Sequence, residues 1–394
     1  MSTGAAELLQ DTGGTITDEA ATTTGEIAAR SPLALFWRRL RRDKVALVAL
    51  GFIVLLIVIA IFAGQIVKLF GAHPPNAQNS DALDSFGSAA APGHGYIMGT
   101  DALGRDVFSR TIYGARISLA TAFLATGLIV MIGVTLGMIA GYYRGFVDTA
   151  LSRSMDVVLA FPVLLLALGL GAACSLKGCL TADAVGRDLF IFAIIILVMP
   201  VIGAATSQLR GRPGFRGLTG SDWVLRLAPG VIFLVAAVIF SFVLSSNATL
   251  IQPGLPVVIF VITLAGWPYM ARIIRGQVLS LREKEFVEAA RSLGASDARI
   301  IFRHILPNLV APIIVYTTLL IPTNILFEAA LSFLGVGVQP PTASWGAMIA
   351  DAIAIFDTAW WYMTFPGVAL LLTVLAFNLI GDGLQDALNP RTGR

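Results

Sequence analysis

Long apolar runs separated by short polar segments occupy most of the chain after residue 44. Each run holds about twenty residues, the length that an α-helix needs to cross the roughly 30 Å apolar core of a bilayer. The pattern predicts about eight membrane-spanning helices, at residues 45–67, 119–140, 156–172, 189–208, 229–246, 256–274, 308–327 and 363–380. The predicted fold class is therefore an all-α, polytopic membrane helical bundle. Phe161-Pro162 lies inside the third run and predicts a kink there.

Composition supports this class. Of 394 residues, 56% are hydrophobic and only 13% are charged, whereas a soluble domain is normally about a quarter charged. The formal net charge of +3 gives no reason to expect a nucleic-acid partner, and membrane lipid is the expected surroundings.

The distribution of basic residues predicts the orientation. A cluster precedes the first apolar run, namely Arg38, Arg39, Arg41, Arg42 and Lys44. Because positive residues favour the cytoplasmic side, we expect the N-terminus and, after an even number of spans, the C-terminus to be cytoplasmic.

The chain divides into six predicted regions. They are a disordered cytoplasmic tail at 1–31, a basic segment with the first span at 32–67, an extracytoplasmic loop at 68–118, core spans at 119–172, an insertion with two extra spans at 173–253, and a second core part at 254–394. Cys174 and Cys179 would face outside, where a disulfide is permitted; two free thiols are the alternative.

Residues 283–307 carry dense charge within an apolar surrounding. Phe286, Ala290 and Leu293 share one face at helical spacing, and Gly294 stands where the helix should end. Ser296 and Asp297 are candidate caps for a second helix, and Pro307 should end the pattern before the next span. The pattern predicts two short helices joined by a turn.

A second charged stretch, Gly99 to Leu119, precedes the second span. Its spacing allows a helix in which Asp106 and Arg110 pair at i,i+4. The preferred interpretation is an interfacial helix whose charges neutralise one another.

Polar residues within the predicted spans are weak candidates for a cargo path: Trp267, Asn324 and Glu328. Packing between helices is the alternative for all three, and Glu328 could instead lie solvated at the interface. The segment 331–362 lacks Lys and Arg and should be external; its aromatic residues Trp345, Trp360, Trp361 and Tyr362 suit a headgroup-level belt.

Catalytic motifs are missing from the sequence. There is no Gly-x4-Gly-Lys-Ser/Thr phosphate loop and no His-Glu-x-x-His zinc motif, and the cysteines and histidines lack metal-site spacing. We predict no catalytic residue, metal or cofactor on this chain.

Two motifs resemble known ones. Glu288-Ala289-Ala290, Gly294 and Leu306-Pro307 resemble the EAA loop of bacterial ABC importer permeases, with His304 at the usual Ile position. Glu328-Ala329-Ala330 has no Leu-Pro at the required distance. The stretch from residue 99 resembles the signature of the dipeptide and oligopeptide branch (DppC/OppC type) through Gly99, Thr100, Asp101, Gly104, Arg105, Asp106 and Arg110.

The resemblance implies a type I importer permease in the bacterial cytoplasmic membrane, moving di- or oligopeptides. It implies a heterodimer with a homologous first permease, two P-loop ATPases that hold ATP and Mg, and an extracytoplasmic peptide-binding protein. The implied ATPase-coupling residues are Phe286, Glu288, Ala289, Ala290, Leu293, Gly294, Leu306 and Pro307, and we therefore call residues 283–307 the coupling segment.

Alternatives remain at this point. Within the family, the cargo could be nickel-chelate complexes, glutathione or opine-like compounds. From other classes, the chain could be a stand-alone secondary transporter, although no inverted pair of interrupted spans is seen, or a membrane anchor without transport.

Overall fold

The computed structural model describes residues 40–83, 87–93, 95–160, 162–165, 167–169 and 255–388. Within these ranges the regular structure is helical, with isolated β-bridges only in the loop before α4. The helices are α2 (Lys44–Ile61), α3 (Ala63–Leu69), η2 (Ser80–Ala82), α4 (Val107–Tyr142), α5 (Phe146–Ala160), α9 (Leu255–Leu281), α10 (Glu285–Ser292), α11 (Asp297–Arg299), η4 (Ile300–Ile305), α12 (Leu306–Phe333), α13 (Trp345–Ala352), η5 (Ile353–Ile355) and α14 (Trp360–Leu388).

The predicted fold class is confirmed. Five helices among the described residues are long and apolar enough to cross a membrane, and a sixth span results if α5 and Val163–Gly169, inclined at 72°, form one broken span. The bend falls at Pro162, as predicted. The two spans expected in the insertion, Cys174, Cys179 and the tail 1–31 lie outside the described residues.

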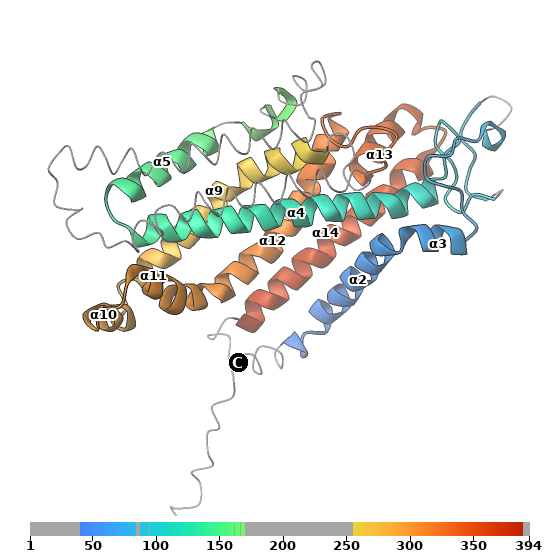
Figure 1. Ribbon diagram of the computed structural model, residues 1–394. Coiled ribbons are helices and arrows are strands. Elements are labelled where there is room, and N and C mark those ends of the chain that lie inside the picture. The colour runs from blue at the N-terminus through green and yellow to red at the C-terminus, as the bar shows by residue number, and fades with distance from the viewer. Residues whose placement is uncertain are drawn as a thin grey trace, which may run out of the picture.

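The first predicted span is divided in the structure. Asp43 caps α2 by accepting hydrogen bonds from Val45 N at 2.9 Å and Ala46 N at 3.0 Å, and the helix ends before Phe62. Its 18 residues rise about 27 Å, close to the thickness of the bilayer core. The short helix α3 therefore begins near the membrane surface and bends away from α2 (Figure 1).

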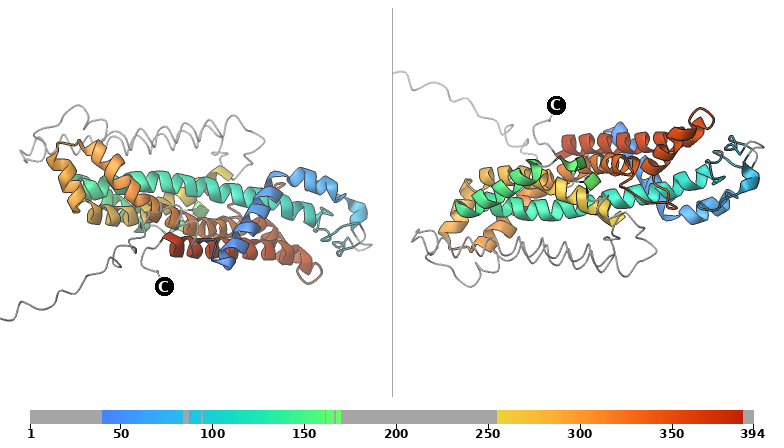
Figure 2. Two further views of the ribbon diagram at one scale, coloured as in Figure 1. Left: turned by 90° about the horizontal axis from the view of Figure 1, so that it is seen from below. Right: turned by 90° about the horizontal axis from the view of Figure 1, so that it is seen from above.

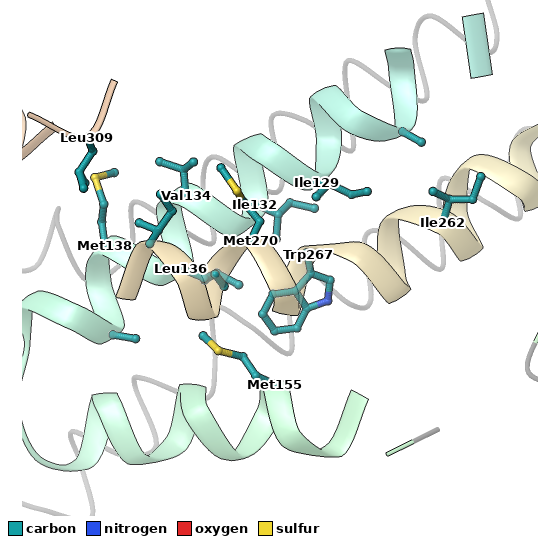
Figure 3. Close-up of a cluster of buried hydrophobic side chains, with 14 of the residues drawn as sticks. Ile129, Ile132, Val134, Leu136, Met138, Met155, Ile262, Trp267, Met270 and Leu309 are labelled. Atoms are coloured by element: carbon teal, nitrogen blue, oxygen red, sulfur yellow. The ribbon is translucent and has the colours of Figure 1, made fainter. Parts of the chain in front are cut away.

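The pair α4 and α9 makes the most extensive helix contact. Gly133, Gly137 and Gly141 recur at every fourth position of α4 and face α9; an added Cβ at each would lie 2.6 Å from an α9 atom. Small residues at this spacing let helix backbones approach closely. Buried apolar side chains extend this contact along both helices, and Trp267 of α9 points towards Met155 of α5 (Figure 3).

The prediction of an aromatic belt after α12 is wrong for three of its four residues. Trp345, Trp361 and Tyr362 are buried, and only Trp360 of the four is exposed. Trp345 Nε1 donates to Thr111 O and Trp361 Nε1 donates to Thr100 O, each at 3.0 Å. Because these indole N–H groups find carbonyl partners inside the protein, the rings pack there instead of at lipid headgroups.

The bundle is elongated. The coupling segment forms one end, and α3 with the loop before α4 forms the other end (Figures 1 and 2). Any signal between these ends must pass along the long helices, of which α4 alone covers 36 residues.

Candidate functional site

The coupling segment has the predicted helix–turn–helix form. The first helix, α10, ends at Ser292, and the residue after its C-cap, Gly294, has a left-handed conformation with φ of +77°. Gly294 N donates to Arg291 O and Ala295 N donates to Ala290 O, both at 3.0 Å. These two bonds form a Schellman motif, which satisfies the last carbonyls of the helix and turns the chain sharply.

The buried face of α10 differs from the prediction. Val287 and Ala290 are buried in the cluster that includes Ile274 and Val278 of α9. Phe286 and Leu293 were expected beside Ala290, but they are 40% and 88% exposed. The helix is thus held by small aliphatic residues and presents larger apolar residues outward.

The outward surface of the coupling segment is mixed in chemistry. Glu288, Ala289 and Gly294 are exposed, and Phe302 of η4 is about half exposed. The Glu288 carboxylate has no hydrogen bond or ion pair among the described residues. An exposed apolar residue beside an unpaired charge suits contact with another protein.

The second half of the segment corrects two predictions. Ser296 occupies the N-cap position of α11 but makes no side-chain cap hydrogen bond. Pro307 does not end the helix: it lies in the first turn of α12, directly after the π-helical turn η4. Proline has no N–H to donate to the preceding turn, and the irregular π-helical turn η4 stands at this point of the run. The helical run is continuous from Asp297 to Phe333. Within it, Leu306 is partly buried and Pro307 is exposed.

Contacts between the end of α4 and residues 282–297 hold the base of the segment. The Tyr142 hydroxyl donates to Asp297 Oδ1 at 2.7 Å, and Arg282 Nη1 donates to Gly141 O at 2.7 Å. Arg144 pairs with Glu283, and this guanidinium, with the hydrogen bond from Arg282, lowers the pKa of Glu283. The coupling segment is therefore joined to α4 as well as to its own chain neighbours.

Tyr142→Phe is expected to loosen the segment without unfolding the bundle. The change removes one hydroxyl-to-carboxylate hydrogen bond and keeps the ring, so the local loss should be about 1–2 kcal/mol. Hydrogen–deuterium exchange over residues 285–305 should then accelerate roughly ten-fold. Thr135→Val is the matched control, because that hydroxyl bonds only Met131 O on its own helix. Unchanged exchange in Tyr142→Phe would show that the bond does not hold the segment.

The second charged stretch forms a buried ionic cluster at the opposite end. Asp101 Oδ2 lies 2.6 Å from Arg105 Nε and 3.7 Å from Arg110 Nε. Arg110 Nη1 also donates to Pro75 O at 3.2 Å and Pro341 O at 3.3 Å. All three charged residues are buried, so this cluster ties the loop before α4 to the segment that follows α12.

Asp106 has a different role from the one predicted. It caps α4 by accepting from Phe108 N at 2.9 Å and Ser109 N at 3.3 Å, so it does not pair with Arg110. The stretch from Gly99 to Arg105 is loop. The expectation that its charges neutralise one another is confirmed for Asp101 with Arg105 and Arg110, but the helix begins only at Val107 and continues into the span.

Two glycines and a threonine complete this cluster. Gly99 and Gly104 have φ of +76° and +72°, and an added Cβ at Gly104 would lie 2.2 Å from Asn79 O. The Thr100 hydroxyl accepts from Ala90 N at 2.8 Å. The motif residues thus act through loop geometry and close packing.

The weak cargo-path candidates are all buried within this chain. Asn324 Nδ2 donates to Thr126 Oγ1 at 2.8 Å, which joins α12 to α4. Glu328 accepts from Ser118 Oγ at 2.7 Å and Ser332 Oγ at 2.8 Å. Glu328 is therefore not solvated at an interface. A contact of these residues or of Trp267 with cargo stays a prediction.

Sequence reasoning missed Val287, Tyr142 and Arg282. Val287 and Phe286 lie three and four residues before Ala290, so helical spacing allows either beside Ala290 and does not decide between them. Tyr142 and Arg282 bond groups more than 130 residues away, and no local pattern indicates such contacts. Among the residues that the structure covers, no group of His, Cys, Asp and Glu could hold a metal ion.

Comparison with known proteins places these features in context. Residues 133–394 match the family described as "Binding-protein-dependent transport system inner membrane component". Residues 31–92 match the "N-terminal TM domain of oligopeptide transport permease C". The chain is similar to the glutathione transport system permease protein GsiD of Escherichia coli O6:K15:H31 (strain 536) and of Shigella boydii serotype 4 (strain Sb227). Identity is 37% in both cases, over 362 residues that cover 92% of this chain and 91% of each relative.

Proposed function

This chain belongs to the family of binding-protein-dependent transport system inner membrane components, and from this premise we propose that it moves small peptides as one of two permease subunits. Membership makes it a multi-pass transport subunit of an ABC importer in the inner membrane, of the dipeptide and oligopeptide type. Such a subunit works in a complex with ATPases and a substrate-binding protein.

The observation that carries the proposal is the outward face of α10. Leu293 is 88% exposed on a helix that is itself held to the bundle by Val287 and Ala290. A rigid element with exposed apolar residues favours docking to a partner over packing within the chain. We infer that the ATPase subunits cover this face, and that the coupling segment, 283–307, transmits their motion.

The proposed mechanism is alternating access. The ATPases hold ATP and Mg, and their closure displaces α10. The Tyr142–Asp297 hydrogen bond carries that displacement to α4. Arg282, which directly follows α9, links α9 to α4 through Gly141 O. The segment faces the ATPases, so this end of the bundle is cytoplasmic, and so are both termini. No chemistry on this chain is required, because the subunit acts as conduit and lever.

The second permease would cover the apolar faces that this chain leaves open. Val310 and Ile314 of α12 and Leu371 and Leu375 of α14 are exposed. A homologous first permease packed there would give the heterodimer, with the cargo path between the two subunits and lipid around them.

For the cargo, di- and oligopeptides are the first proposal and glutathione is the second. The match of residues 31–92 to an oligopeptide permease domain supports peptides in general. The similarity to a glutathione permease over 92% of this chain favours glutathione, which is itself a tripeptide.

The test is reconstitution of this chain with its permease partner, ATPases and binding protein in proteoliposomes. Uptake of labelled di-, tri- and pentapeptides, glutathione and a nickel chelate is measured with and without ATP. ATP-dependent uptake of unmodified peptides supports the first proposal, and uptake of glutathione alone replaces it with the second. Uptake without ATP or the ATPases would overturn both.

Leu293→Ala is expected to weaken ATPase binding. Truncating a leucine that becomes buried in the complex removes about 2 kcal/mol, a loss of roughly thirty-fold in affinity. Co-purification of ATPase with the tagged chain measures it. Phe146→Ala is the matched control, since Phe146 is also exposed, at the start of α5. Equal ATPase recovery in both variants would place the docking face elsewhere.

A further inference from the structure

A hollow at the opposite end from the coupling segment has no role in the coupling mechanism. It lies between α3, the outer end of α4 and the turn at Pro74 and Pro75, with a volume of about 330 Å³. Three polar side chains line it: Gln65 and Lys68 of α3 and Tyr113 of α4. A volume near 300 Å³ is large enough for a small ligand or headgroup.

The polar groups in this hollow are available to a ligand. Gln65, Lys68 and Tyr113 make no hydrogen bond or ion pair with any residue that the structure describes. Gly64 lets the phenol approach α3, because an added Cβ there would lie 3.2 Å from Tyr113 Oη. An ammonium, a carboxamide and a phenol hydroxyl together supply the donors that a phosphate group accepts.

The position of the hollow selects a membrane ligand. The apolar helix α2 ends at Ile61, and α3 begins at Ala63 and bends away from it (Figure 1). Because α2 rises about 27 Å, close to the thickness of the bilayer core, we expect α3 at headgroup level. Ile61, Leu69 and Phe70, which flank the lining residues of α3 along the chain, are exposed, Leu69 by 82%. A basic side chain next to exposed apolar residues at this depth suits a phosphate that carries acyl chains.

We propose that this hollow binds the headgroup phosphate of an anionic phospholipid in the leaflet opposite the ATPases. Lys68 pairs with the phosphate, Gln65 and Tyr113 donate hydrogen bonds to its oxygens, and the acyl chains follow the exposed apolar side of α2. A bound lipid would join α3 to α4 at the end where the extracytoplasmic loop is attached.

The test uses the assembled transporter in nanodiscs that contain phosphatidylcholine with a small fraction of photoactivatable phosphatidylglycerol. Crosslinked peptides from α3 and the start of α4 are quantified by mass spectrometry. Lys68→Gln should lower crosslinking about five-fold, the effect of one basic residue near a lipid surface, and Tyr113→Phe should lower it less. Arg116→Gln is the matched control, because Arg116 is an exposed cation of α4 outside the hollow and should leave crosslinking unchanged.

Three results would overturn the proposal. One is equal crosslinking in Lys68→Gln and Arg116→Gln, which would indicate a diffuse attraction of lipid to any surface cation. The second is equal labelling by a photoactivatable phosphatidylcholine, which would remove the requirement for an anionic lipid. The third is full displacement by millimolar inorganic phosphate, which would identify a soluble anion as the ligand.

Discussion

Gly294→Arg is expected to abolish cargo-stimulated ATP hydrolysis by the assembled transporter while leaving membrane insertion of the chain intact. Gly294 has φ of +77°, a conformation that costs an L-residue about 1–2 kcal/mol. An added Cβ meets nothing within 4 Å, so the side chain can leave the backbone without a clash. Its guanidinium would instead enter the docking face beside Leu293, where an unpaired charge costs several kcal/mol if it is buried.

Two controls separate backbone strain from loss of the docking surface. Gly145→Arg places the same side chain at φ of +85°, also in open space, in the α4–α5 connection at the same end of the bundle. Its stimulated hydrolysis should stay near that of the unchanged protein. Gly294→Asn should retain most activity, because asparagine tolerates the left-handed region. Normal stimulated turnover in Gly294→Arg, or equal loss in Gly145→Arg, would contradict the docking assignment.

The turn of the coupling segment was predictable because its cause is local. Only glycine adopts the left-handed C′ position without steric cost, so Gly294 at the end of an apolar stripe indicates the helix end. The orientation of α10 was not predictable in the same way. Phe286 and Val287 are neighbours of similar hydrophobicity, and which of them is buried depends on where α9 runs beneath the helix.

The ionic cluster shows how two local rules compete. Asp106 and Arg110 have the spacing of an i,i+4 pair, but Asp106 also stands where a helix begins. Capping satisfies two backbone N–H groups, Phe108 N and Ser109 N, which have no partner within the first turn of the helix. Arg110 is then free to approach Asp101, a contact across the loop that spacing along one helix does not predict.

Outside the insertion, hydropathy predicted five spans that the structure confirms, and a further span at residues 156–172 that is present only if the bent pair α5 and Val163–Gly169 is one span. It did not predict where the neighbouring aromatic residues pack. Trp345 and Trp361 follow an apolar span in a segment without basic residues, which is typical of a headgroup belt. Their N–H groups bond carbonyls of Thr111 and Thr100, more than 230 residues earlier. Contacts over such separations depend on the assembled bundle, and a pattern in one segment carries no information about them.

Gly137→Leu is expected to prevent assembly of the bundle. An added Cβ at Gly137 would lie 2.6 Å from Ala271 O and 2.9 Å from Ile274 Cβ, distances that real side chains do not occupy. The backbones of α4 and α9 would have to separate along the contact that also contains Gly133 and Gly141. Overpacking of a well-packed core by smaller changes already costs about 1–3 kcal/mol, so an isobutyl group should exceed the stability of the pair.

A graded pair of variants makes this expectation testable without relying on a protein that fails to fold. Gly137→Ala should lower the midpoint of thermal unfolding of the detergent-solubilised complex by several degrees, since about 1–3 kcal/mol is lost. Gly127→Ala, on the same helix, should leave it unchanged or raise it slightly, because nothing lies within 4 Å of that position and alanine favours helix over glycine. Fluorescence-detected size exclusion after heating measures both. Equal midpoints would mean that close approach of α4 to α9 does not hold the bundle together.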